Sequence, residues 1–254
     1  MNRFKIVAIA AVAAALAAAA VANALIVQVG DLILKADGGF APKALPKFEN
    51  APIKIYGGGR LSTKSGELPP ILDTINIEFD RHGAVDTLGL PVCRQGRLEA
   101  TTSPQARKAC PNAIVGKGNG SAVVQFPESK PIPVSSPITI FNGPKKGRND
   151  TILAHAYTTV PVPTTFIVPV VIEKINKGVY GYRTEAKIPK IANEYGHPIS
   201  GNLTIDRKWT FKGKKHSYVN ARCETGHLQA RVEATFKNGD FLSGVFIRPC
   251  KVRK

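Results

Sequence analysis

The sequence lacks the short motifs that mark most catalytic and metal-binding sites. It contains no G-x-S-x-G, S-x-x-K or H-E-x-x-H pattern, and no C-x-x-C pair for a metal. The histidines are scattered without the spacing of metal ligands; they stand at positions 82, 155, 197, 216 and 227. The sequence therefore predicts no metal and no cofactor. Because paired carboxylates can be distant in sequence, the absence of motifs makes an enzyme less favoured without excluding one.

Acidic residues are also scarce. The 254 residues include 35 Lys and Arg against 18 Asp and Glu, a formal net charge of +17. The first 24 residues hold two of these cations and no acid, so the chain from Leu25 onward keeps a charge of +15. A surplus of this size attracts anionic surfaces such as cell-wall polymers, acidic lipid or polysaccharide, and the attraction weakens as salt is added.

Long apolar runs are confined to the N-terminus. Arg3 and Lys5 precede an uncharged run rich in Ala, Val and Ile over 6–21, and Ala22-Asn23-Ala24 forms an A-x-A processing site. This is the pattern of a secretory signal peptide. A transmembrane anchor is the alternative, but the run is alanine-rich and only weakly hydrophobic. We expect a signal peptide helix over 1–24, cleavage near Ala24, and a mature protein that is secreted or held at the outer face of the cell envelope.

Cysteine is used sparingly, with four residues. In an exported chain four cysteines are read as two disulfides, although they permit three pairings that sequence alone cannot distinguish. Proximity along the chain favours Cys93–Cys110 and Cys223–Cys250. Loops of this size would each stabilise the fold by about 3 kcal/mol through loop-closure entropy.

From Leu25 onward the hydrophobic period is two rather than 3.6. Apolar and polar residues alternate most clearly over 75–80, 182–188 and 228–236, as in an antiparallel sheet with one buried face. Further strands are expected at 26–35, 51–56, 113–126, 132–141, 151–160, 164–174, 200–211, 215–222 and 241–248. Pro161, Pro163 and Pro169 interrupt one of these runs and indicate edge positions or strand breaks.

About a dozen short strands predict an all-β fold, an antiparallel sandwich that is jelly-roll-like or built from two packed β lobes. The Gly-, Pro- and Lys-rich segment 141–150 is either a linker between lobes 25–142 and 150–254 or a long hairpin loop. One short helix is expected near 103–110, with Ser103 as N-cap and Pro104 at the first helical position.

The segment 207–218, "RKWTFKGKKHSY", interleaves cations with aromatic residues. Trp209 and Phe211 share the parity of Leu203 and Ile205, so we expect a hairpin with a core-facing tryptophan and a solvated basic tip. A surface for nucleic acid would need several exposed aromatics on one sheet face, and export also argues against nucleic acid as a partner.

Two clusters of cations are candidate anion-binding residues, provided that the fold brings them to one face. They are Lys145, Lys146 and Arg148 in the middle loop, and Lys212, Lys214 and Lys215 at the hairpin tip. Lys251, Arg253 and Lys254 form a third cluster at the C-terminus.

Carboxylates offer two other readings. Asp80 and Asp86 surround a glycine turn as in a calcium loop, but Arg81 and His82 occupy intervening positions, so a hairpin turn is favoured. A hydrolase would need two carboxylates in one cleft; its candidates are Asp80, Asp86, Glu185, Asp206 and Glu233.

Several segments resemble a family of uncharacterised exported β-rich proteins of actinobacteria. They include "PPILDTINIEFDRHG", "PIPVSSPITIFNG", "AHAYTTVPVPTTF" and the tail from Trp209 to Cys250, and the resemblance covers most of the mature chain. The family has no assigned activity, so the resemblance implies no catalytic residue. Its members often carry an arginine-rich segment where this chain has lysines and Trp209; the charge is kept, but the bidentate geometry of arginine is not.

These features together predict a secreted or envelope-associated all-β protein with a non-enzymatic, binding or structural role. Its expected partner is an anionic cell-wall polymer or membrane surface. The alternative is a secreted hydrolase that acts on cell-wall polymer or polysaccharide.

Overall fold

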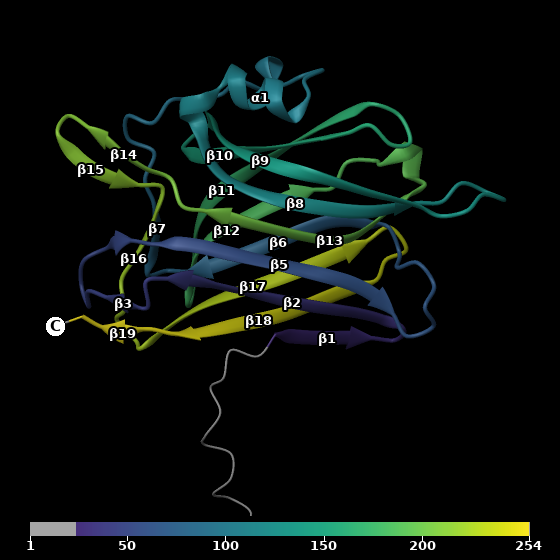
Figure 1. Ribbon diagram of the computed structural model, residues 1–254. Coiled ribbons are helices and arrows are strands. Elements are labelled where there is room, and N and C mark those ends of the chain that lie inside the picture. Colours follow the sequence, from purple (N-terminus) through teal and green to yellow (C-terminus); the bar gives the residue numbers. More distant parts are fainter. Residues whose placement is uncertain (1–23, 254) are drawn as a thin grey trace, which may run out of the picture.

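The computed structural model describes residues 24–253, and the protein is all-β, as predicted (Figure 1). Residues 1–23 of the predicted signal peptide helix lie outside the described residues. Among the residues that are described, no helix is long and apolar enough to span a membrane. The polypeptide forms one large antiparallel sheet of 12 strands, two two-stranded ribbons and a three-stranded sheet.

The strands of the large sheet are β1 (Leu25–Val29), β2 (Leu32–Ala41), β5 (Lys54–Thr63), β6 (Leu72–Asp80), β8 (Ile114–Val124), β9 (Ile132–Lys146), β10 (Asn149–Thr158), β11 (Thr164–Lys177), β12 (Tyr180–Lys187), β13 (Gly196–Ile205), β17 (His227–Phe236) and β18 (Phe241–Pro249). The shorter strands are β3 (Ala44–Leu45), β4 (Ala51–Pro52), β7 (Gly83–Val85), β14 (Lys208–Phe211), β15 (Lys214–Ser217), β16 (Val219–Ala221) and β19 (Lys251–Val252). The helical elements are α1 (Ser103–Ala109) and the short 3-10 turns η1 (Gln95–Arg97), η2 (Pro111–Ala113) and η3 (Ala192–Glu194).

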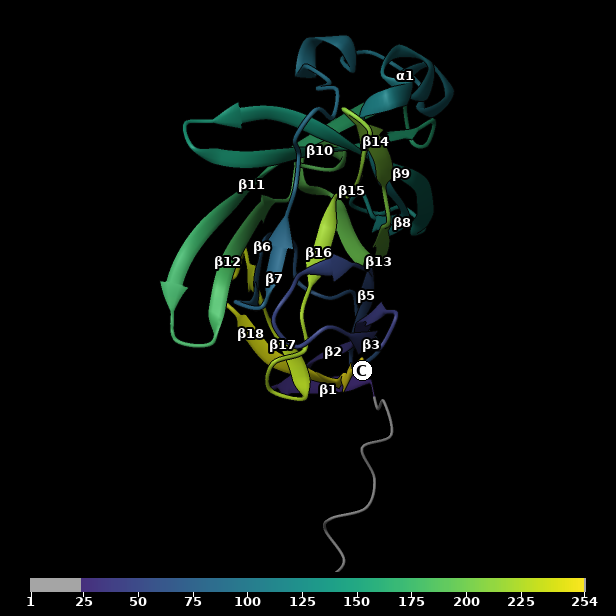
Figure 2. The ribbon, with the colours of Figure 1, turned by 90° about the vertical axis from the view of Figure 1, so that its left-hand side faces the viewer.

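The large sheet folds over on itself into an antiparallel sandwich. Its strand order is β1-β2-β5-β13-β8-β9-β10-β11-β12-β6-β17-β18, and β5 and β13 lie across from β6 and β12 (Figure 2). The outermost strands β1 and β18 meet at Gly244, where a side chain would collide with Leu25 at 2.3 Å from its Cβ. The absence of a side chain at Gly244 thus lets Leu25 of β1 pack directly on the backbone of β18.

Two main clusters of apolar side chains lie inside the sandwich. The first joins β2 and β5 to β6, β17 and β18; its buried members are Leu32, Leu34, Ala36, Leu61, Leu72, Ala234, Phe236, Leu242 and Phe246. The second lies near the β14–β15 hairpin; its buried members are Leu90, Val115, Ile140, Ile152, Val170, Ile172, Ile205 and Tyr218. Each fully buried Leu or Ile side chain stabilises the fold by roughly 1.5–3 kcal/mol.

Both predicted disulfides are confirmed. The Cα atoms are 5.7 Å apart in Cys93–Cys110 and 5.9 Å apart in Cys223–Cys250, and no cysteine is free among residues 24–253. Both distances are ordinary for the bond. The first bridge ties α1 to the loop before it, and the second ties the segment after β16 to the end of β18.

The predicted helix is confirmed, but the predicted N-cap is wrong. Thr102, not Ser103, caps α1: its Oγ1 accepts a hydrogen bond from the N–H of Gln105, whose side chain accepts one from the N–H of Thr102. This reciprocal capping box needs Gln or Glu three residues after the cap. Gln105 meets that spacing for Thr102 but not for Ser103, so the helix begins one residue earlier than predicted.

Several predicted strands differ in extent from the observed ones. The expected strand 26–35 is a hairpin, because Gly30 takes a positive φ of 57° and turns β1 into β2. The expected strand 200–211 ends at Ile205, and β14 begins only at Lys208. Pro161 and Pro163 lie between β10 and β11, and Pro169 lies in β11 before its ladder to β12 begins at Val171. The prolines thus mark a break and a locally unpaired edge, as predicted.

The segment 141–150 forms the ends of β9 and β10, which pair as a hairpin with Lys146 opposite Asn149. Strands from 25–142 and from 150–254 alternate within the one sheet: β5 pairs with β13, and β6 lies between β12 and β17.

Candidate anion-binding end

The predicted cations lie on two hairpins, and all six are exposed. Lys145 and Lys146 close β9 and Arg148 lies in the turn to β10, while Lys212, Lys214 and Lys215 surround the tip of β14–β15. The second tip is tight because Lys212 and Gly213 take positive φ values of 48° and 73°. Two successive left-handed residues are the geometry of a type I′ hairpin turn. The predicted basic hairpin is therefore confirmed.

Residues 86–89 join the two hairpins at one end of the sandwich. The hydroxyl of Thr87 donates to Asp150 at 2.9 Å, and Lys145 pairs with the same carboxylate at 3.2 Å. On the other side, the indole N–H of Trp209 donates to the carbonyl of Leu88 at 2.9 Å. The fold thus brings both predicted clusters to the same end of the molecule.

The C-terminal residues lie at this end too. β19 pairs in parallel with β3, and it places Lys251 and Arg253 in exposed positions near the β14–β15 hairpin end of the molecule (Figure 1). Lys254 of the predicted third cluster lies outside the described residues. We call the 145–148 turn, the β14–β15 hairpin and residues 251–253 the basic end.

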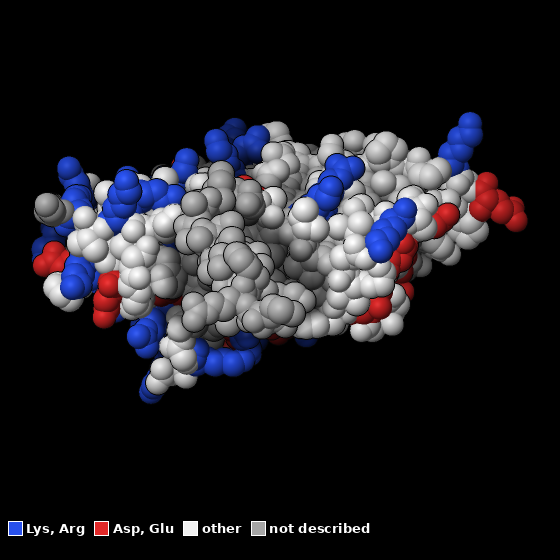
Figure 3. Space-filling view, turned by 90° about the horizontal axis from the view of Figure 1, so that it is seen from below, with Lys and Arg blue, Asp and Glu red and all other residues white. Residues whose placement is uncertain are grey.

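The opposite end carries no surplus of positive charge. The connections 64–67, 127–130, 190–194 and 237–240 each hold one lysine and one acid. Hydrogen bonds tie them together: the N–H of Gln125 donates to the carbonyl of Tyr195, His197 contacts the carbonyl of Pro69, and the N–H of Lys237 donates to the carbonyl of Ile71. In Figure 3, Lys and Arg gather toward the end that bears the C-terminus in Figure 1. The net charge is therefore polarised along the molecule.

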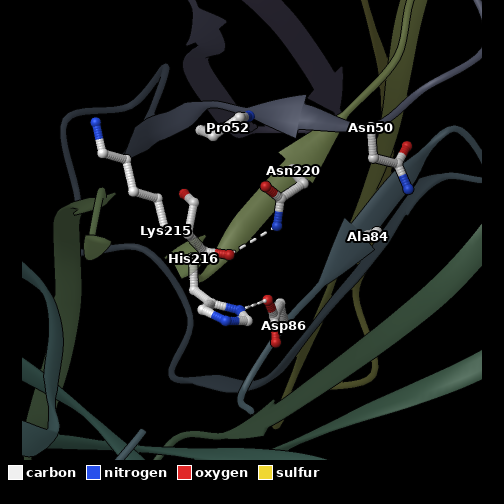
Figure 4. Close-up of a pocket in the computed structure, with 8 residues that line it drawn as sticks. Asn50, Pro52, Ala84, Asp86, Lys215, His216 and Asn220 are labelled. Carbon is white, nitrogen blue, oxygen red and sulfur yellow. Dashed lines mark hydrogen bonds and ion pairs between the residues drawn. The ribbon is translucent and has the colours of Figure 1, made fainter. Parts of the chain in front are cut away.

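A polar pocket of about 340 Å³ opens at the basic end between β4, β7, β15 and β16 (Figure 4). Its lining residues are Asn50, Pro52, Ala84, Asp86, Lys215, His216, Ser217 and Asn220. Asp86 Oδ2 lies 2.7 Å from Nδ1 of His216, and Asn220 donates to the carbonyl of Ser217 at 2.7 Å. The pocket is thus lined by a carboxylate together with an ammonium, an imidazole and two side-chain amides, which suits a polar group.

The aromatic residues of the hairpin hold it against the body of the protein. The Trp209 ring stacks on His216 with centroids 5.5 Å apart and packs against the second apolar cluster, so its predicted inward orientation is confirmed, although it is only half-buried. Phe211 covers Gly89, where a Cβ would lie 2.2 Å from the ring. Tyr218 is fully buried; burial, with a smaller contribution from Asp150, raises the pKa of its phenol far above the usual value.

The candidate hydrolase carboxylates are not gathered in one cleft. Asp80 is buried and accepts hydrogen bonds from the N–H groups of His82 and Gln229, whereas Asp86 lines the pocket. Glu185 and Glu233 pair with Lys187 and Arg231 on opposite sides of β6, and Asp206 is exposed between β13 and β14. Across residues 24–253, no group of three or more His, Cys, Asp or Glu side chains is placed to hold a metal ion.

Sequence reasoning missed two arrangements. Asp86 and His216 are 130 residues apart, so no local pattern pairs them. His155 is fully buried, and its Nε2 lies 3.0 Å from the hydroxyl and 3.1 Å from the carbonyl of Thr101. The helix-bearing loop after Cys93 covers this histidine, and the alternation of β10 alone could not show that.

Comparison with known proteins adds no assignment: no protein-family model, curated protein or solved structure matches the chain. The resemblance to exported actinobacterial proteins stays a prediction. Any function must therefore be argued from the geometry of the chain itself.

Proposed function

We propose that this is an exported, non-enzymatic binding protein whose basic end attaches to an anionic polymer of the cell envelope. The observation that carries the proposal is the polarised charge: two hairpins and the C-terminal strand present exposed cations at one end, while the connections at the other end are balanced. The two disulfides are compatible with an oxidising location outside the cytoplasm.

The arrangement of the cations favours a long polyanion over a single small ligand. They stand on separate turns, and five of the eight are lysines at the tips of the two hairpins. Lysine acts as a mobile point charge, whereas arginine forms fixed bidentate contacts. An exposed ion pair contributes only about 0–1 kcal/mol, so useful affinity requires many contacts along one chain of negative charges. A wall polymer supplies such a chain.

The test is cosedimentation of the mature protein, residues 25–254, with purified anionic wall polymer across a salt series. We expect binding at low salt that is lost progressively as the Debye length falls from about 30 Å at 0.01 M to about 10 Å at 0.1 M salt. A parallel experiment with vesicles of anionic lipid measures binding to a membrane surface, the alternative partner. Absence of binding to the polymer at low salt would refute the proposal, and tighter binding to vesicles than to polymer would replace the polymer with a membrane surface.

A further inference from the structure

The centre of β13 is uncovered on both of its faces. Gly201, Asn202 and Leu203 are consecutive and all exposed, although β13 is hydrogen-bonded to β5 on one side and β8 on the other. Successive residues of a strand point to opposite faces of a sheet. One exposed face is the outside of the sandwich, so the other exposed face must be the inside. Leu203 shares its face with Ile205 of the second apolar cluster, and yet it is 36% exposed.

Glycines surround Leu203 on the inner surface of this layer. Gly57 of β5 lies opposite Leu203, and Gly38 of β2 lies opposite Gly57. In the neighbouring row on the same inner face, Gly201 of β13 lies between Gly59 of β5 and Gly120 of β8. A Cβ built at Gly57, Gly201 or Gly120 would meet only atoms of adjacent strands within 4 Å, and none from the facing layer. No side chain of the facing layer therefore touches this glycine surface.

The facing layer presents uncharged side chains to this space. Thr184, Ile77 and Val232 form a cross-strand row over β12, β6 and β17, and Val232 packs on the first apolar cluster. All three are only half-buried, and Figure 2 shows these strands across from β5 and β13. A hollow bordered by these rows thus lies between the two layers; at its β2 end Arg248 donates to the carbonyl of Gly38 at 2.6 Å and pairs with Asp37. Protein interiors are normally packed as densely as organic crystals, so the hollow requires an explanation.

We infer that this hollow binds the acyl chain of a fatty acid. Apart from Arg248 at the β2 end, which is paired with Asp37, the rows that line it carry no charged side chain, and an ionised group would be costly there without a partner. Its glycine floor extends over β2, β5, β13 and β8, about 14 Å at roughly 4.8 Å between neighbouring strands, a shape suited to an extended chain. The carboxylate stays in water at the rim, where the positive charge of the protein favours it; only this last clause rests on the proposed function.

The test uses the mature protein and dodecanoate, with binding followed by native mass spectrometry and calorimetry. We expect one saturable site. Gly57→Leu and Leu203→Trp each add side-chain volume to the hollow from a different strand, so each should weaken binding by at least about tenfold. Asn119→Leu places the same leucine side chain at an exposed position on the outer face of β8 and should leave the affinity within about threefold. Circular dichroism establishes which variants are folded.

A charge variant separates this inference from the proposed function. Replacement of Lys212, Lys214 and Lys215 by Glu should remove polymer binding, whereas dodecanoate should still bind within about threefold of the wild-type affinity. Failure of the wild type to bind dodecanoate saturably would overturn the inference. So would a folded Gly57→Leu or Leu203→Trp variant that binds it as tightly as the wild type. Neither result would affect polymer binding at the basic end.

Discussion

Nδ1 of His216 lies 2.7 Å from Oδ2 of Asp86, and the other carboxylate oxygen of Asp86 accepts the N–H of Leu88 at 2.9 Å. One side chain therefore joins the β14–β15 hairpin to the segment that also contacts the β9–β10 hairpin. Because Asp86 is partly buried, this carboxylate helps to hold the basic end in place.

Replacing Asp86 by Asn should loosen the basic end. In this variant the ring of His216 and the N–H of Leu88 lose their charged hydrogen-bond acceptor. We therefore expect the free energy of unfolding in urea to fall by about 1–2 kcal/mol. Amide hydrogen exchange over 214–217 should become faster. Asp206→Asn is the matched control, because Asp206 is exposed near the same hairpin. Equal losses in the two variants would show that the contact with His216 has no special weight.

Reversal of charge at the basic end should abolish polymer binding. The triple change of Lys212, Lys214 and Lys215 to Glu alters the net charge by the same amount as the triple change of Lys64, Lys130 and Lys190 to Glu at the opposite end. If the basic end makes the contacts, cosedimentation at low salt should fall by at least about tenfold in the first variant and by no more than about threefold in the second. Equal losses would mean that only the total charge matters.

The sequence signal was strongest where the sandwich is most regular. The three clearest alternating segments became β6, β12 and β17, which are neighbours in the sheet and pack one face on the apolar clusters. By contrast, the single strand predicted at 51–56 corresponds to β4, Ala51–Pro52, and the first residues of β5, Lys54–Thr63. The centre of β5, Gly57-Gly58-Gly59, has no side chains to alternate, so the period of two could not extend the predicted strand to Thr63. The alternation of apolar and polar side chains was therefore missing from the middle of β5.

The strand order had no local signal. β5 pairs with β13 and β1 meets β18 at Gly244, contacts between distant segments that depend on the whole fold. The same holds for the candidate site: charge identified the six cations, and turn residues placed them on hairpins, but only tertiary structure shows that they share one end. The pocket with Asp86 and His216 could not have been predicted from either segment alone.

His155 should make the protein sensitive to mild acid. Burial lowers its pKa below the usual 6.5, so the folded state keeps the ring neutral while the unfolded state takes up a proton. The unfolded state then binds more protons below about pH 6.5, and stability falls with decreasing pH by at most about 1.4 kcal/mol per pH unit. His155→Gln cannot titrate, and the slope of unfolding free energy between pH 6.5 and 5 should flatten. An unchanged slope would contradict this account; His227→Gln controls for the loss of a partly exposed histidine.

Loss of the Cys93–Cys110 bridge should cost about 3 kcal/mol of stability, because the bond closes a loop of 17 residues. Both cysteines belong to the cluster that packs α1 on Phe141 and Leu153. For a chain of this size, the double change to Ala should lower the melting temperature by about 6–12 °C. A drop of less than about 2 °C would mean that packing alone holds α1.

Glu78 is the most buried acid in the described chain, at 1% exposure. It lies on β6 directly between Arg183 of β12 and Arg231 of β17. Arg183 donates to it at 2.8 Å, Arg231 donates to its other oxygen, and Nζ of Lys177 lies 3.7 Å away. Burial alone would raise the pKa of this carboxyl, but the hydrogen bonds from the two arginines outweigh burial and hold the pKa below its usual value.

Glu78→Gln should therefore destabilise the protein by about 3 kcal/mol at pH 7, because two partly covered guanidinium groups lose their shared counter-charge. A carboxyl with a lowered pKa contributes its stability above the unfolded pKa, here 4.5, and that contribution is lost as pH falls through the folded value. The gap between wild type and variant should consequently narrow below pH 4.5. Glu185→Gln, half-exposed on β12 and 4.0 Å from Lys187, should cost less than about 1 kcal/mol. If both variants lost a similar free energy of unfolding in urea, the arginines would have found other partners. The pairing of β6 with β12 and β17 would then depend on backbone hydrogen bonds alone.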